Sequence, residues 1–147
     1  MNGLFAAVAV ATSVLAQGAA PEWKSSYAEA YHAGKNARRP VLVVIDKPAE
    51  AAYRIDQASF TRGEVAADER ALLANYELCH IDAGTEYGQK IAKRFGATQF
   101  PYVAITDRGV DVLLVEHTGR MSQDQWMATL AKYRTGQRAA EPAVCFT

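Results

Sequence analysis

The fold is decided by residues 40–46, which read PVLVVID. Five consecutive aliphatic residues follow the proline, and no polar residue alternates with them. A continuous apolar run of this length is typical of a strand that is covered on both faces in a parallel sheet. We therefore predict that residues 41–45 form a central strand, which ends where residues 46–48 (DKP) interrupt the run.

Helices and strands alternate on both sides of this run. Before it, Ser25 and Ser26 are candidate caps of a helix that ends within residues 34–39. After it, the patterns predict a helical stretch over 49–60 and a second helical piece that begins at a capping box, Thr61 and Glu64, and runs through 73. A strand over 76–82 and a helix over 86–95 follow. The last elements are two strands, over 102–106 and 110–116, joined by a turn at 107–109 (DRG), and a helix over 123–133. This order predicts one small α/β layer structure with two crossover connections and a terminal hairpin.

Two segments carry a resemblance to a known family. Residues 34–44 (GKNARRPVLVV) are similar to the "GKPVLV" segment of exported thioredoxin-like proteins, and residues 95–103 (FGATQFPYV) resemble their "YGVxGxPTxV" segment, whose proline is cis. The resemblance covers about residues 23–134. It implies a thioredoxin-like three-layer α/β fold, with a central mixed sheet of about four strands flanked by helices. It also implies a cis-Pro loop, Phe100–Pro101, before the third strand.

The resemblance places the redox motif of this family on residues 49–52 (AEAA). In the family, thiol exchange uses a Cys-x-x-Cys at a helix N-terminus, where the helix dipole stabilises the thiolate. Both cysteine positions, Ala49 and Ala52, are alanine, and no cysteine occurs between residues 46 and 78. The carboxylate that some members carry six residues before the first cysteine falls on Val43. Alanine can neither attack nor resolve a disulfide, so we expect a redox-inactive domain.

The other half of the family's site is retained. In relatives, the backbone beside the cis proline pairs with an extended peptide, which adds to the sheet like one more strand. The resemblance implies a protein or peptide partner at this edge. The alternative is that the proline forms a purely structural turn. Tyr102 is predicted either to join an apolar rim around the edge or to belong to the core. The candidate binding residues are Gln99, Phe100, Pro101, Pro48 and Tyr53.

The two cysteines of the chain, Cys79 and Cys145, lie outside the motif and are too few for a disulfide scaffold or a zinc cluster. Cys79 falls in the predicted strand over 76–82, where we expect a small buried hydrophobe. Cys145 lies in the tail, and three interpretations stay open for it. The first is a disulfide between Cys145 and Cys79, and the second is a disulfide between the Cys145 residues of two chains. The third is that Cys79 or Cys145 is the reactive thiol of a monothiol oxidoreductase.

The first 20 residues differ in composition from the rest. No charged residue precedes Glu22, and the apolar run over 4–16 is too short to span a bilayer but fits a signal peptide. We therefore predict a signal peptide over 1–20, a thioredoxin-like domain over 21–134, a tail over 135–147, and export to the periplasm or the medium. The alternative is an uncleaved N-terminal helix. We expect association with a membrane only if the leader stays uncleaved.

Charge and motifs exclude several classes of function. Sixteen basic and sixteen acidic residues cancel, so the chain has no overall basic field for nucleic acid. His32, His80 and His117 lack metal-ligand spacing, and no nucleotide-binding or hydrolase motif occurs, so we expect no metal and no cofactor. Three classes of function remain: a binding or accessory module, a monothiol oxidoreductase, and a structural component of an exported assembly. One short basic helix face is expected to be merely solvated: Lys90, Lys93 and Arg94.

Overall fold

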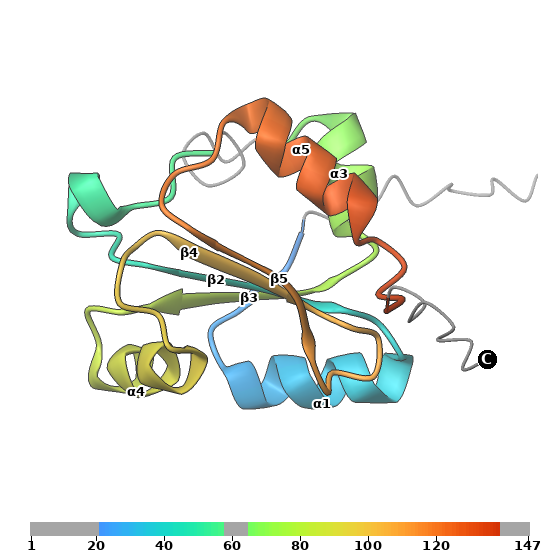
Figure 1. Cartoon of the computed structure of the whole chain (residues 1–147), viewed down its shortest axis with the longest axis horizontal. Helices are drawn as coiled ribbons and strands as arrows, with labels where there is room; N and C mark the ends of the chain where they lie inside the picture. The colour runs from blue at the N-terminus through green and yellow to red at the C-terminus, as the bar shows by residue number, and fades with distance from the viewer. Residues whose placement is uncertain (1–20, 58–64, 139–147) are drawn as a thin grey trace, which may run out of the picture.

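The aliphatic run forms the middle strand of a mixed sheet, as its sequence predicts. The structure is a computed structural model that describes residues 21–57 and 65–138 (Figure 1). Its sheet has five strands in the order β1 (Trp23–Lys24), β3 (Glu77–Asp82), β2 (Val41–Asp46), β4 (Tyr102–Thr106) and β5 (Leu113–Thr118). Within the described ranges, α1 (Tyr27–Ala37) and α4 (Glu86–Phe95) cover one face, and α3 (Ala67–Leu73) and α5 (Gln123–Lys132) cover the other (Figure 1). This architecture confirms the predicted three-layer α/β fold.

The residues of β2 divide the core into two clusters because successive side chains of a strand point to opposite faces. Val43 packs in the cluster under α1 and α4, whereas Val44 packs in the cluster under α3 and α5. β2 runs parallel to β3 and antiparallel to β4, and every residue of β2 is buried. The continuous apolar run is therefore explained by helices on both faces.

Short polar signals fix the helix ends. The Ser26 side chain accepts a hydrogen bond from the backbone of Glu29 at the start of α1. Ser122 and Gln125 form the predicted capping box of α5. Gly96 ends α4 in the left-handed region, with a φ of 69°.

The predicted helix over 49–60 is wrong within the described residues. Only Ala51–Tyr53 forms a 3-10 turn, η1, and residues 54–57 have no helical structure. The reason is tertiary: Oδ2 of Asp46 accepts a hydrogen bond from the backbone N–H of Ile55 and holds the chain against the end of β2. The predicted capping box at Thr61 and Glu64 lies outside the described residues, and α3 begins only after Ala66.

The second half of the hairpin also starts later than predicted. β5 begins at Leu113 instead of 110 because the turn is longer than the Asp-Arg-Gly signal indicates. Val110 adopts a left-handed conformation with a φ of 54°, and Oδ1 of Asp107 accepts hydrogen bonds from the backbone of Asp111 and Val112. At the opposite edge, the two-residue strand β1 was not predicted, and it raises the strand count from about four to five.

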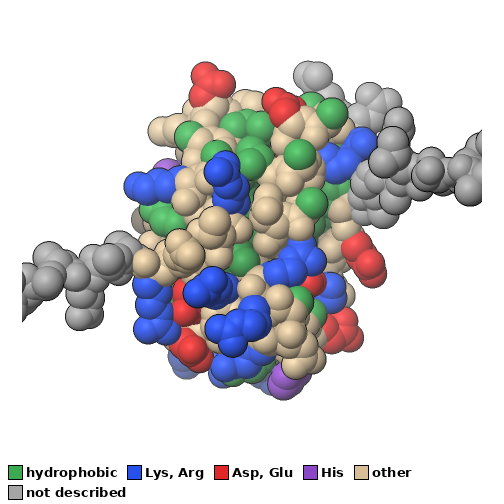
Figure 2. All heavy atoms as spheres, turned by 90° about the vertical axis from the view of Figure 1, so that its right-hand side faces the viewer, with side chains coloured by type: hydrophobic (Ala, Val, Ile, Leu, Met, Phe, Trp, Pro, Cys, Tyr) green, Lys and Arg blue, Asp and Glu red, His purple; other side chains and the backbone are tan. Residues whose placement is uncertain are grey.

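The first residues of the predicted tail pack against this hairpin turn. The carbonyl oxygen of Gly136 accepts a hydrogen bond from Arg108, and the Arg138 guanidinium lies 2.9 Å from the Asp107 carboxylate. Figure 2 shows basic side chains, with acidic ones among them, gathered at this end of the molecule. The described chain is thus held to the domain as far as Arg138.

Candidate functional site

The loop between α4 and β4 carries the motif proline. The Phe100–Pro101 peptide bond is cis, and the buried Pro101 accepts a hydrogen bond from the backbone of Gly119 through its carbonyl oxygen. Gln99 is exposed and Phe100 is half-buried. Within the described residues, no hydrogen bond engages the backbone N–H or C=O of Phe100. The backbone N–H and C=O of Phe100, beside the cis proline, are therefore available to an incoming chain.

The segment over 49–52, where the sequence resemblance places the redox motif, is a closed turn with an exposed surface. Ala49 and Ala52 are both exposed, and the preceding Pro48 is half-buried in the turn. The Lys47 backbone donates to Tyr53, and Glu50 donates back to Lys47. No ionisable side chain stands at either cysteine position of the motif. The turn therefore offers shape and backbone but no nucleophile.

Arg120 fixes this turn from the segment that follows β5. Its Nη2 donates a hydrogen bond of 2.6 Å to the carbonyl oxygen of Ala51, and its Nη1 lies 3.9 Å from the Asp56 carboxylate. Two segments that are distant in sequence, the one around Arg120 and the one over 51–56, thus meet at one end of the sheet. Arg120 is a site residue that the sequence analysis missed, because no motif marks it.

Lys47 joins two of the predicted site residues. Its Nζ lies 5.6 Å from the ring centroid of Tyr53 and 5.6 Å from that of Phe100, a cation–π distance for both rings. Tyr53 is 45% exposed. No carboxylate of the described residues forms an ion pair with Lys47. The result is an exposed aromatic surface with a cation that has no ion-pair partner in the part of the chain that the structure describes.

A pocket of about 350 Å³ continues this surface toward α4. Lys47 and Phe100 line it together with Gln89 and Lys93 of α4. The remaining lining residues are small, and none is acidic. A ligand that crosses the loop would therefore bring a side chain toward two ammonium groups.

A buried carboxylate lies at the inner side of the turn. Asp46 is 1% exposed, and its Oδ1 lies 2.7 Å from Nε2 of His80. It occupies the face under α3 and α5, whereas Val43, where the family's carboxylate was expected, packs under α1 and α4. Position 43 thus offers no carboxylate, as the sequence indicates, and the buried acid at position 46 holds a backbone N–H and an imidazole.

Cys79 does not contribute to this site. It is fully buried in the cluster under α1 and α4, and the structure has it as a free cysteine. Burial raises the pKa of its thiol to about 12, and the positive charge of Lys24 lowers this pKa by a smaller amount. The predicted buried role is thus what the structure shows. Cys145 lies outside the described residues, so its disulfide and the disulfide-linked dimer stay predictions.

Tyr102 belongs to the core, which decides between the two roles predicted for it. It is 3% exposed, and its hydroxyl donates a hydrogen bond of 2.6 Å to Glu116. In the described part of the chain, no group of three or more His, Cys, Asp or Glu side chains is placed to hold a metal ion.

Comparisons with known proteins give likeness in structure only. No protein-family model and no curated protein matches the chain. The chain superposes on a thioredoxin from Thermus thermophilus at 16% identity with a TM-score of 0.61, covering 78% of this chain and 87% of that one. It superposes on thioredoxin NaTrxh from Nicotiana alata at 14% identity and a TM-score of 0.55, covering 80% and 99%. A DsbH oxidoreductase matches at 14% identity and a TM-score of 0.55, covering 83% and 89%. Structural likeness at these sequence identities shows the fold alone. This chain therefore has the thioredoxin-like fold.

Proposed function

We propose that this chain is a redox-inactive thioredoxin-like module that binds an extended peptide segment across the Phe100–Pro101 loop. The observation that carries the proposal is the backbone N–H and C=O of Phe100, which have no hydrogen-bond partner among the described residues. The rings of Phe100 and of the exposed Tyr53 each lie 5.6 Å from Nζ of Lys47. Backbone pairing supplies affinity without any thiol, and neighbouring pockets supply specificity. The cations of Lys47 and Lys93 favour an acidic side chain in the bound segment.

The lack of thiol chemistry is supported by two independent features. Ala49 and Ala52 stand where the cysteines of the motif would stand, and Cys79 is buried with a raised pKa. A thiol in this state is neither ionised at neutral pH nor reachable by a protein disulfide. A monothiol activity would therefore have to use Cys145.

Export is part of the proposal and is supported by the composition of residues 1–20. Among the described residues, no helix has the length and apolar character needed to cross a membrane. Sequencing the N-terminus of the chain recovered from an exported fraction tests this part. A start within residues 17–21 supports cleavage of a leader, and an intact Met1 contradicts it.

Redox inactivity is tested by insulin reduction with dithiothreitol, followed as turbidity, beside an active thioredoxin. We expect no acceleration over dithiothreitol alone. Turnover that disappears in the Cys145→Ser variant would replace the proposal with the monothiol alternative. Turnover that survives both Cys79→Ser and Cys145→Ser would contradict both hypotheses.

Peptide binding is tested by selecting a displayed random peptide library on the full chain and measuring the affinity of a selected peptide. We expect Tyr53→Ala to lower that affinity by about tenfold, because the exposed ring shares Lys47 with Phe100, whose ring and that of Tyr53 each lie 5.6 Å from Nζ. Tyr87→Ala is the matched control, since Tyr87 is 42% exposed but lies on α4 outside this surface. Equal losses in the two variants, or no selected peptide, would contradict the location or the function.

A further inference from the structure

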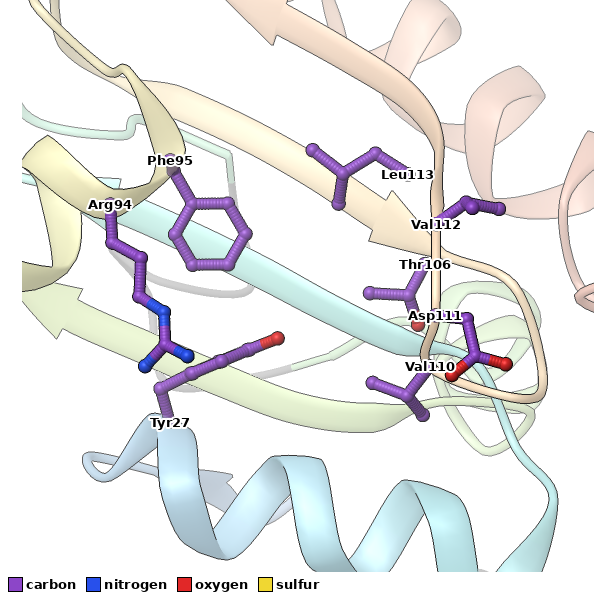
Figure 3. A pocket seen from close by; sticks show the side chains of 8 residues that line it. All are labelled: Tyr27, Arg94, Phe95, Thr106, Val110, Asp111, Val112 and Leu113. Atoms are coloured by element: carbon purple, nitrogen blue, oxygen red, sulfur yellow. The ribbon is translucent and has the colours of Figure 1, made fainter.

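A second pocket lies on the face of the sheet that α1 and α4 cover, at the hairpin between β4 and β5 (Figure 3). Its volume is about 240 Å³, and no residue lines both this pocket and the one beside Phe100. Tyr27 reaches it from α1, Arg94 and Phe95 reach it from α4, and Leu113 borders it at the start of β5 (Figure 3). An inference about this pocket is therefore independent of the proposed peptide site.

The walls of this second pocket are apolar and partly exposed to solvent. Phe95 packs edge-on against Tyr27, with 5.1 Å between the ring centroids. At the rim, Val112 is 41% exposed and Leu113 is 38% exposed. An apolar ligand that covers these side chains removes their surface from water, which favours binding.

The polar groups at the α4 end are donors without acceptors. The Arg94 guanidinium lies beside the Tyr27 ring, and the Tyr27 hydroxyl points into the space between Phe95 and Thr106 (Figure 3). No ion pair of Arg94 and no hydrogen bond of the Tyr27 hydroxyl occurs within residues 21–57 and 65–138. Burial raises the pKa of Tyr27 and the charge of Arg94 opposes this rise, so the phenol keeps its proton and remains a donor at neutral pH.

The other polar groups of the pocket are already engaged. The Thr106 hydroxyl accepts a hydrogen bond from the backbone of Val41 and donates one to the carbonyl oxygen of Asp107. The carboxylate of Asp111, the only acid that lines the pocket, lies 3.1 Å from Lys35 and 3.7 Å from Arg138. Its charge is thus compensated at the opposite end, and it does not oppose an anion at Arg94.

We propose that this pocket binds a small carboxylic acid with an apolar body. The carboxylate accepts hydrogen bonds from Arg94 and Tyr27, and the apolar body lies against Phe95 and Leu113. A guanidinium is the side chain best suited to a carboxylate, since its planar donors match the two oxygens. The volume lies below the range of about 300–1,000 Å³ usual for drug-sized ligands, which favours a small molecule.

The test is a titration of the full chain with octanoate, followed by backbone amide shifts, beside octanamide as the uncharged counterpart. We expect saturable shifts around Tyr27, Phe95 and Leu113 with octanoate, and about tenfold weaker binding of octanamide. Arg94→Gln should weaken octanoate binding by about tenfold. Lys90→Gln is the matched control, because it removes the same charge from the same helix outside the pocket.

Three results would overturn the proposal. The first is equal affinity for octanoate and octanamide, and the second is an equal effect of Arg94→Gln and Lys90→Gln. The third is the absence of saturable shifts at the lining residues up to millimolar octanoate. Tyr27→Phe adds a variant that keeps the packed ring and removes only the hydroxyl, and we expect it to weaken octanoate several-fold and octanamide by a smaller factor, since the neutral carbonyl is the weaker acceptor.

Discussion

Nε2 of His80 lies 2.7 Å from Oδ1 of Asp46, so the end of β2 is joined to the interior of β3 by a side-chain hydrogen bond as well as by the sheet. The second oxygen of Asp46 accepts the backbone N–H of Ile55. We expect Asp46→Ala to lower the free energy of unfolding by about 1–3 kcal/mol, because it leaves a buried donor without its acceptor. Urea unfolding followed by tryptophan fluorescence measures this loss.

The control for Asp46 is Asp56→Ala, which removes a carboxylate from the same segment. The side chain of Asp56 is 51% exposed and lies 3.9 Å from Arg120, so we expect a change of less than about 0.5 kcal/mol. Equal losses in the two variants would show that the bonds of Asp46 do not stabilise the fold.

A second buried polar pair joins α3 to α5. Nε1 of Trp126 donates a hydrogen bond of 2.6 Å to Oε1 of Glu69, and both side chains are buried. We expect Trp126→Phe to lower the free energy of unfolding by about 2–4 kcal/mol, because the carboxylate loses a donor and the core loses volume. In a Glu69→Leu background the same substitution should cost less. A cost that is unchanged in that background would mean that packing alone explains the effect.

The thiol of Cys79 should be unreactive in the folded protein. In the Cys145→Ser variant, we expect alkylation by iodoacetamide at pH 8 to be at least about a hundredfold slower in the folded state than in urea, since only the thiolate reacts. Mass spectrometry of quenched samples follows the reaction. Fast alkylation of the folded chain would contradict the burial of this side chain.

The same thiol should make stability fall at high pH. Its pKa is raised from 9.0 to about 12, so the folded state favours the neutral thiol. The corresponding stabilisation is complete below pH 9 and is lost as pH rises toward 12. Cys79→Ala should flatten this part of the stability profile relative to the parent chain, as measured by urea unfolding between pH 8 and 11. Parallel profiles for the two proteins would refute the assignment.

Gly88 should not tolerate a methyl group, although it lies within a helix. A Cβ there would stand 1.7 Å from the carbonyl oxygen of Asp82, which is backbone and cannot move aside. Glycine to alanine in a helix usually stabilises by about 1 kcal/mol, so we expect the opposite sign here, with a loss of about 2 kcal/mol or more. Thermal unfolding followed by circular dichroism measures this loss.

Gly84→Ala is the comparison for Gly88. Its Cβ would stand 3.0 Å from Oδ1 of Asp82, an atom of a side chain that can rotate. We expect a loss below about 1 kcal/mol. Equal tolerance of alanine at both glycines would contradict the close approach of α4 to the end of β3.

The elements that depend on long periodic patterns were predictable from sequence. The strand β2 and the helix α4 occur where the apolar run and the helical spacing place them. The segment after Pro48 was not predictable, because its alanines favour a helix while the bond between Asp46 and Ile55 extends the chain. The start of β5 was missed for a similar reason, since nothing marks Val110 as left-handed.

The candidate sites were predictable only where a motif carries them. Pro101 and the lost cysteine positions followed from the resemblance. Lys47 and Arg120 act through contacts between separate segments, and sequence spacing contains no trace of such contacts. Arg94 was interpreted as part of a solvated face, whereas it lines a pocket formed by four segments.

The three-residue turn η1 has a consequence for any attempt to rebuild a redox centre here. Ala49→Cys together with Ala52→Cys would return two sulfur atoms to this surface. A turn of three residues aligns too few peptide dipoles to lower the pKa of a thiol as a full helix N-terminus does. The two thiols would titrate near the ordinary cysteine range and exchange slowly at neutral pH. A Cys-x-x-Cys placed at these positions would therefore need a different backbone, with a full helix after the first cysteine, to lower the pKa of its thiol.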